Sequence, residues 1–105
     1  MIKNLTPHPI TVGEVTIAPA GTVARVSASF VECGAIEGHP VFKQEFGPVV
    51  DLPDPESGVV LVVSAIVAAA LKGSRPDVVA LATGHPAVVR DEQGRIASVP
   101  GFVTT

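Results

Sequence analysis

A continuous apolar stretch from Val59 to Leu71 constrains the fold of this chain more than any other feature. It spans 13 residues and contains a single hydroxyl group, that of Ser64. The β-branched run before Ser64 is typical of a strand buried on both faces, and the residues after it are mostly strong helix formers. Ser64 is a favoured N-cap, and Gly73 suits the left-handed position that follows a helix. A membrane span needs about 20 apolar residues, so the stretch predicts a buried strand and a two-turn helix.

The predicted helix over residues 65–71 has no polar face, because all of its residues are Ala, Ile, Val or Leu. A helix that is apolar all round must be buried on all sides, and one domain of this size has little material for that. The whole chain is also lean in solvating groups, with 47% hydrophobic and 16% charged residues. We therefore expect self-association, in which a second copy of the chain covers part of this surface in a homo-oligomer.

Strand-like segments and tight turns surround the helix. The apolar run Val78–Ala82 follows it, and a strand–helix–strand unit implies two parallel strands joined by a right-handed crossover. Near the start of the chain, Gly13 lies between two short β-type runs over residues 10–17, which predicts a two-residue hairpin turn. A second hairpin is predicted over residues 87–99, where Asp91 to Gly94 form the turn.

The middle of the chain predicts two more strands. Residues Thr22–Glu32 alternate between apolar and polar side chains, which is typical of a half-buried strand. Pro40–Phe46 gives a second short strand, and Gly34 and Gly38 bracket the turn between them.

These patterns together predict one domain over residues 1–105. Its expected class is α/β, bordering on α+β. We expect a small mixed, mostly β sheet with N-terminal hairpins, one short central helix in a strand–helix–strand unit, and a C-terminal hairpin.

Charge and cysteine content narrow the classes of partner. The net charge is −3, the seven Lys and Arg residues are dispersed, and the chain has four Phe but no Tyr or Trp. Nucleic-acid binders need clustered cations and usually aromatics, so we expect no nucleic-acid partner. Because the longest apolar run is too short to span a bilayer, we also expect no membrane partner. The lone Cys33 cannot form an internal disulfide, and prolines stand where a signal peptide would need an apolar segment. The predicted location is cytoplasmic.

The sequence shows no established catalytic or metal-binding motif, and we expect no cofactor. His8, His39 and His85 are far apart in sequence and each precedes a proline, which disfavours a helical metal-binding face. Cys33 follows Glu32, whose charge opposes thiolate formation; a small packed residue is the simpler interpretation. These absences favour a non-enzymatic role.

Two segments are candidates for a ligand site. Ser64 lies where a buried strand passes into a helix, and α/β sheets bind ligands beyond the carboxyl ends of their strands, often as anions at helix N-termini. The loop from Asn4 to His8 offers polar groups on a backbone stiffened by prolines. Arg75 and Arg90 are candidate anion clamps. Ser64 is alternatively only a cap, and the loop only the entry into the first strand. The predicted ligand-binding residues are Asn4, Thr6, His8, Ser64, Arg75 and Arg90.

Several of these segments together resemble a known family. They are Asn4-Leu-Thr-Pro-His8, Leu52-Pro-Asp-Pro-Glu-Ser-Gly58, the segment from Val63 to Leu71, Arg75-Pro-Asp77 and the segment from Arg90 to Ile96. In combination they resemble a small uncharacterised family of bacterial and phage genomes. The resemblance implies no activity, but it implies that the N-terminal loop and the Ser64 junction belong to one recurring design.

Three hypotheses for function follow. The leading one is a non-enzymatic binding or assembly domain that takes a small anionic ligand at Ser64, near the loop of residues 4–8. The second is a small enzyme acting on a nucleotide-like substrate, with His8 as the acid–base group and Arg75 or Arg90 as the anion clamp. The third is a phage- or plasmid-encoded protein that sequesters a host signal or inhibits a host protein.

Overall fold

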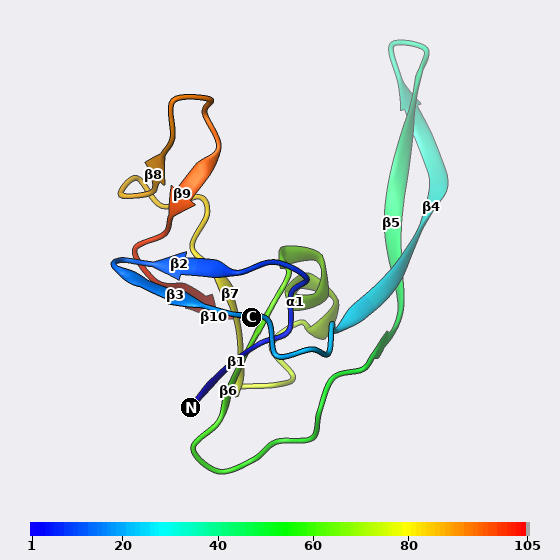
Figure 1. Cartoon of the computed structure of the whole chain (residues 1–105). Coiled ribbons are helices and arrows are strands. Elements are labelled where there is room, and N and C mark those ends of the chain that lie inside the picture. Colours follow the sequence, from blue (N-terminus) through cyan, green and yellow to red (C-terminus); the bar gives the residue numbers. More distant parts are fainter. Residues whose placement is uncertain (105) are drawn as a thin grey trace.

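Strands dominate the fold, and a single short helix accompanies them within the described residues (Figure 1). The structure is a computed structural model that describes residues 1–104. The prediction of a small mixed fold, mostly β with one helix, agrees with this structure, although α/β character is confined to one strand–helix–strand unit. The elements are β1 (Ile2–Asn4), β2 (Ile10–Val12), β3 (Val15–Ile17), β4 (Arg25–Ile36), β5 (His39–Val50), β6 (Val60–Val63), α1 (Ala65–Leu71), β7 (Val78–Leu81), β8 (Val89–Arg90), β9 (Ile96–Ser98) and β10 (Phe102–Thr104).

The central sheet has the strand order β1-β6-β7-β10. β1, β6 and β7 run parallel, and β10 pairs antiparallel with β7. Leu61, Val62 and Val63 of β6 are buried, as the β-branched run predicts for an inner strand. The predicted crossover through α1 connects β6 to β7. The outer strands β1 and β10 were not predicted, because each has three residues and pairs with a strand distant in sequence. The equally short β2 and β3 were predictable from the glycine turn that joins them.

Helix α1 begins after Ser64 and ends at Leu71, as predicted, but its surroundings differ from the prediction. Gly73 has the expected left-handed conformation with φ of 77°, and Lys72 shares it with φ of 51°. The prediction that the helix is buried on all sides is wrong, because Val67 is its one buried residue and Ile66 is 41% exposed. A helix packed on a sheet buries one face only. Ala68 and Leu71 are partly buried against the core, whereas Ala65, Ile66 and Ala69 face solvent.

The hydrophobic core lies between α1 and the sheet. Val67 from the helix meets strand residues and two residues from segments outside the strands. Both of these, Leu5 and Ala24, are held by backbone hydrogen bonds, since the Leu5 N–H donates to the Val62 carbonyl at 2.8 Å and the Ala24 N–H donates to the Leu5 carbonyl at 3.2 Å. The buried cluster consists of Leu5, Ala24, Leu61, Val63, Val67 and Val78.

Strands β4 and β5 form one long hairpin, which we call the arm (residues 25–50), and it projects away from the central sheet (Figure 1). The prediction of a half-buried strand over Thr22–Glu32 is wrong, because nearly every residue of β4 is exposed. The turn contains fewer residues than the predicted segment from Gly34 to Gly38, because Gly34 belongs to β4 and pairs with Val41 of β5. Glu37 and Gly38 make the turn, with φ of 50° and 80°, which is the pattern of a type I′ hairpin.

The other two hairpins agree with the sequence prediction. β2 pairs with β3 around Gly13, whose φ is 58°, and β8 pairs with β9 around Gly94, whose φ is 80°. The Asp91 carboxylate accepts hydrogen bonds from the backbone N–H groups of Gln93 and Arg95, both at 2.9 Å. Within residues 1–104, no helix is long and apolar enough to cross a membrane.

An ion pair secures the crossover between α1 and β7. Arg75 donates from Nε and Nη2 to the two carboxylate oxygens of Asp77 at 3.0 and 2.9 Å, and Nη2 also donates to the Pro53 carbonyl at 2.7 Å. The hydrogen bond from Arg75 lowers the pKa of Asp77 below its ordinary value of 3.8. The same bond raises the pKa of Arg75. The pair therefore ties the proline-rich connector to the start of β7.

Replacing Asp77 with Asn is expected to lower the free energy of unfolding at pH 7 by about 1–2 kcal/mol. Because the pKa of Asp77 is lower in the folded state, its contribution is present above the unfolded pKa and is lost as pH falls through the folded value. The difference between wild type and Asp77→Asn therefore shrinks on acidification below about pH 4. Urea unfolding between pH 7 and pH 3 measures it. Asp54→Asn is the control, and a gap that stays constant over this range contradicts the prediction.

Candidate functional site

Asn4 is fully buried at the end of β1 and organises the loop that follows it. Its Nδ2 donates to the carbonyls of His8 at 2.8 Å and Ile17 at 3.1 Å. Its Oδ1 accepts from the Thr6 backbone N–H at 3.0 Å and from the Thr6 hydroxyl at 2.6 Å. Both amide protons and the carbonyl oxygen are therefore occupied within the protein. Asn4 therefore fixes the conformation of the loop, and its polar atoms are not available to a ligand.

The loop after Asn4 lies against the end of β6. The Leu5 N–H donates to the Val62 carbonyl and so holds the start of the loop beside the end of β6. This places Thr6 and Pro7 next to Ser64, at the carboxyl ends of β1 and β6. The Thr6 hydroxyl has one proton, and its acceptors at Asn4 and His8 both lie within the loop. The Thr6 side chain therefore offers a ligand one acceptor oxygen and a methyl group, but no free donor.

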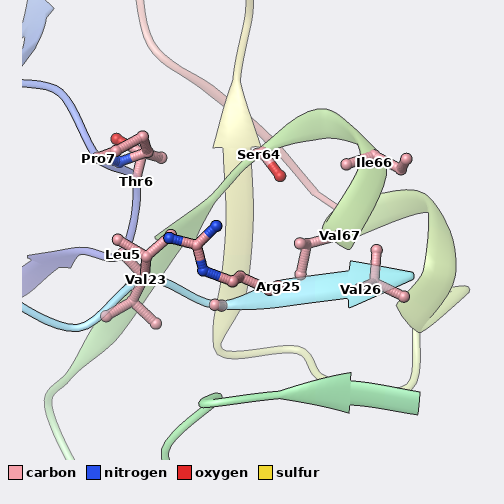
Figure 2. Close-up of a pocket in the computed structure, with 10 residues that line it drawn as sticks. Leu5, Thr6, Pro7, Val23, Arg25, Val26, Ser64, Ile66 and Val67 are labelled. Carbon is pink, nitrogen blue, oxygen red and sulfur yellow. The ribbon is translucent and has the colours of Figure 1, made fainter. Parts of the chain in front are cut away.

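An open cleft of about 330 Å³ lies between this loop, the start of β4 and α1 (Figure 2). We call it the Arg25 cleft. Its polar side chains are those of Thr6, Arg25 and Ser64, and the other lining residues are apolar. Figure 2 shows Arg25 extending from β4 toward the Leu5–Pro7 loop, while Ser64 lies on the helix side. The apolar lining consists of Leu5, Pro7, Val23, Ala24, Val26, Ile66 and Val67.

Arg25 is the residue of this cleft that the sequence analysis missed. Its side chain is exposed, and the two ion pairs found among residues 1–104 involve other residues. Arg25 reaches the cleft because the neighbouring Ala24 N–H is bonded to the Leu5 carbonyl, a contact between segments about 20 residues apart in sequence. A signal in the sequence was the alternation of residues 24–26, because it puts Arg25 on the other face of the strand from its apolar neighbours Ala24 and Val26.

Ser64 keeps a free hydroxyl in the cleft. It occupies the N-cap position with φ of −67° and ψ of 159°, but its side chain makes no capping hydrogen bond. The prediction of Ser64 as the N-cap is therefore correct for its position but not for its hydrogen bond. The hydroxyl is available as a donor. Helix α1 has only seven residues, and we assign no anion affinity to its dipole. The donors that the cleft presents to a ligand are the Arg25 guanidinium and the Ser64 hydroxyl.

The structure brings together only some of the residues predicted for the site. Thr6 and Ser64 line the Arg25 cleft, whereas His8 lines a neighbouring cleft of about 290 Å³ that includes Thr6 but neither predicted arginine. Arg75 is engaged by Asp77 and Pro53. The Nη1 of Arg90 donates to the Gly94 carbonyl at 2.9 Å within the β8–β9 hairpin. The acid–base group and anion clamp of the enzyme hypothesis do not share a cleft.

Metal ligands and known relatives add no further assignment. In the part of the chain that the structure describes, no three His, Cys, Asp or Glu side chains come together as a metal site. No family model, curated protein or solved structure matches the chain. The family resemblance inferred from the sequence motifs stays a prediction.

Proposed function

We propose that this protein binds a small organic anion in the Arg25 cleft. The anionic group pairs with the Arg25 guanidinium and accepts from the Ser64 hydroxyl, and an apolar body rests against Leu5 and Val67. One observation supports this proposal above the others, namely an arginine without an acidic partner at the rim of an apolar cleft. Arginine binds carboxylates and phosphates through two parallel hydrogen bonds.

The dimensions and lining of the cleft suit such a ligand. Small-molecule sites typically measure about 300–1,000 Å³ and combine apolar walls with a few polar groups. The Arg25 cleft, at about 330 Å³, falls at the lower end of this range. A simple inorganic anion would leave most of the apolar wall uncovered, so the chemistry favours a carboxylate or phosphate ester with an apolar portion.

The cleft supports binding more than turnover. No His, Asp, Glu, Lys or Cys side chain lines it, and general acid–base or nucleophilic catalysis depends on such groups. The hypothesis of a non-enzymatic binding domain is therefore the one we retain. Sequestration of a host signal is compatible with the same cleft and differs only in the source of the ligand.

Titration with 2-naphthoate and with its uncharged analogue 2-naphthalenemethanol tests the proposal. We expect 2-naphthoate to shift the backbone amide resonances of Leu5, Thr6, Arg25 and Ser64 in ¹H–¹⁵N spectra, and the alcohol to bind at least about ten-fold more weakly. Arg25→Gln should weaken 2-naphthoate binding by a similar factor. Ser64→Ala should weaken it less and leave stability unchanged, because the hydroxyl caps nothing.

Arg95→Gln is the matched control, since Arg95 is an exposed arginine of the β8–β9 hairpin and does not line the cleft. It should bind 2-naphthoate as wild type does. Equal affinity for the acid and the alcohol, or resonance shifts confined to residues outside the cleft, would overturn the proposal. An Arg25→Gln variant with undiminished affinity would overturn it as well.

A further inference from the structure

One face of the arm concentrates the aromatic side chains of this protein. In the β4–β5 register Ala28 pairs with Phe46, and Glu32 pairs with Phe42. Phe30 lies between Ala28 and Glu32 on β4, so three of the four phenylalanines of the sequence share one face. The rings of Phe30 and Phe42 make an edge-to-face contact with centroids 6.5 Å apart. We call this the aromatic face; it consists of Ala28, Phe30, Phe42 and Phe46, together with the polar residues Glu32 and Gln44.

The aromatic face lies open to solvent in the single chain. Phe30 is 66% exposed and Phe42 is 52% exposed. The radius of gyration is 15.9 Å, whereas a compact domain of this length has about 13 Å, and the projecting arm accounts for the excess (Figure 1). A two-stranded ribbon is at best marginally stable in water without a further layer. The arm therefore has the properties of an element that another surface covers.

The size of the aromatic face fits one partner of ordinary dimensions. At roughly 200 Å² for a fully exposed phenylalanine, Phe30 and Phe42 with the exposed neighbours Ala28, Ala35 and Pro40 present on the order of 400 Å² of apolar surface. A standard interface buries about 800 Å² per partner, of which about 57%, or roughly 450 Å², is apolar. One arm thus supplies nearly the whole apolar share of a stable interface.

A second arm is the partner that complements this face most simply. In a two-fold contact the same patch meets itself, so Phe30 and Phe42 pack against the same two side chains of the other copy. Glu32 is the charged side chain of β4 on the aromatic face, where it pairs with Phe42, whereas Glu45 and Lys43 pair with Ser29 and Val31 on the opposite face. The face therefore carries little charge, and Glu32 can lie at the rim of the contact. The apolar, solvent-facing side of α1, which includes Ile66, adds to the surface that a single chain leaves uncovered.

We propose that the protein is a homodimer whose two copies pack the aromatic faces of their arms together about a two-fold axis. The proposal is independent of ligand binding in the Arg25 cleft. Sedimentation equilibrium of the full chain at micromolar concentration tests it. We expect twice the 10.7 kDa mass of one chain, and the double variant Phe30→Ser with Phe42→Ser should raise the dimer dissociation constant by at least about 100-fold.

Two further variants keep the test specific. Val15→Ser with Val89→Ser removes two exposed apolar side chains from the other hairpins, and this matched control should remain dimeric. Ala28→Glu adds a second negative charge beside Glu32 on both aromatic faces without removing an aromatic ring, and it should also produce monomers, with the circular dichroism spectrum of wild type. A monomeric wild type would overturn the proposal. This outcome would also be found if a different protein covered the arm, and it would overturn the proposal in that case too. Undiminished dimerisation of the folded Phe30/Phe42 or Ala28 variants would overturn it too.

Discussion

Replacing Asn4 with Ala is expected to lower the free energy of unfolding by about 3 kcal/mol or more. The side chain is fully buried, and its four hydrogen bonds join three backbone positions of the loop and of β3. Alanine removes these bonds and leaves the Ile17 carbonyl and the Thr6 N–H without this partner, while the His8 carbonyl keeps the Thr6 hydroxyl as a donor. An orphaned buried group costs about 1–3 kcal/mol. Because two backbone groups lose this partner together, the loss exceeds that of a single ordinary hydrogen bond.

Urea unfolding at pH 7 measures this loss, with Thr6→Ala as the matched control. Thr6→Ala removes one hydroxyl from the same loop but leaves the backbone N–H bonded to the Asn4 oxygen, so it should cost only about 1 kcal/mol. Amide hydrogen exchange at Leu5 gives a local readout, since its N–H is bonded to the Val62 carbonyl. Equal losses in the two variants would contradict a central role for Asn4.

The part of the fold that the sequence predicted depends on local chemistry. The β-branched run of β6, the helix formers of α1 and the left-handed Gly73 are all read from neighbouring residues, and each was correct in position. The hairpin turns at Gly13 and Gly94 were predictable for the same reason, because a turn position with positive φ strongly favours glycine. These features need no knowledge of distant contacts.

The errors concern what each element faces. Alternation along β4 showed that Phe30 and its neighbours share a face, but alternation does not say whether any part of the protein covers that face. The same limitation affects α1, where apolar composition predicted complete burial and Ile66 is exposed. Burial is a property of tertiary packing, and a chain that associates with a copy of itself shows the same pattern as a core.

The sequence predicted the site residues that lie at strand ends, Thr6 and Ser64. It missed Arg25, which comes from a segment distant in sequence. Thr6 and Ser64 lie together because β1 and β6 are parallel neighbours, which the strand-end rule anticipates. Arg25 joins them through a backbone contact between Ala24 and Leu5 that leaves no local pattern. Asn4 has the polar character of a ligand-binding residue, yet polar side chains at strand ends serve equally well to close loops.

Leu5 links the core to the Arg25 cleft, and Leu5→Ala is expected to lower the free energy of unfolding by about 3 kcal/mol. The side chain is 1% exposed, belongs to the buried cluster and also lines the cleft. Leu71→Ala is the matched control, because Leu71 packs at the edge of the same cluster and is only partly buried. The same deletion there should cost about 1 kcal/mol, since little cavity remains when neighbours and water fill the space.

The two leucine variants also separate packing from the shape of the cleft. Removing the Leu5 side chain deepens the Arg25 cleft at its floor, so 2-naphthoate should lose contact with the wall while its carboxylate keeps the Arg25 partner. We therefore expect Leu5→Ala to weaken 2-naphthoate binding by a smaller factor than Arg25→Gln, and Leu71→Ala to leave it unchanged. Urea unfolding and the ¹H–¹⁵N titration measure the two effects on the same samples. If Leu5→Ala and Leu71→Ala lost equal stability, Leu5 would not be part of the core, because burial is what distinguishes the two positions.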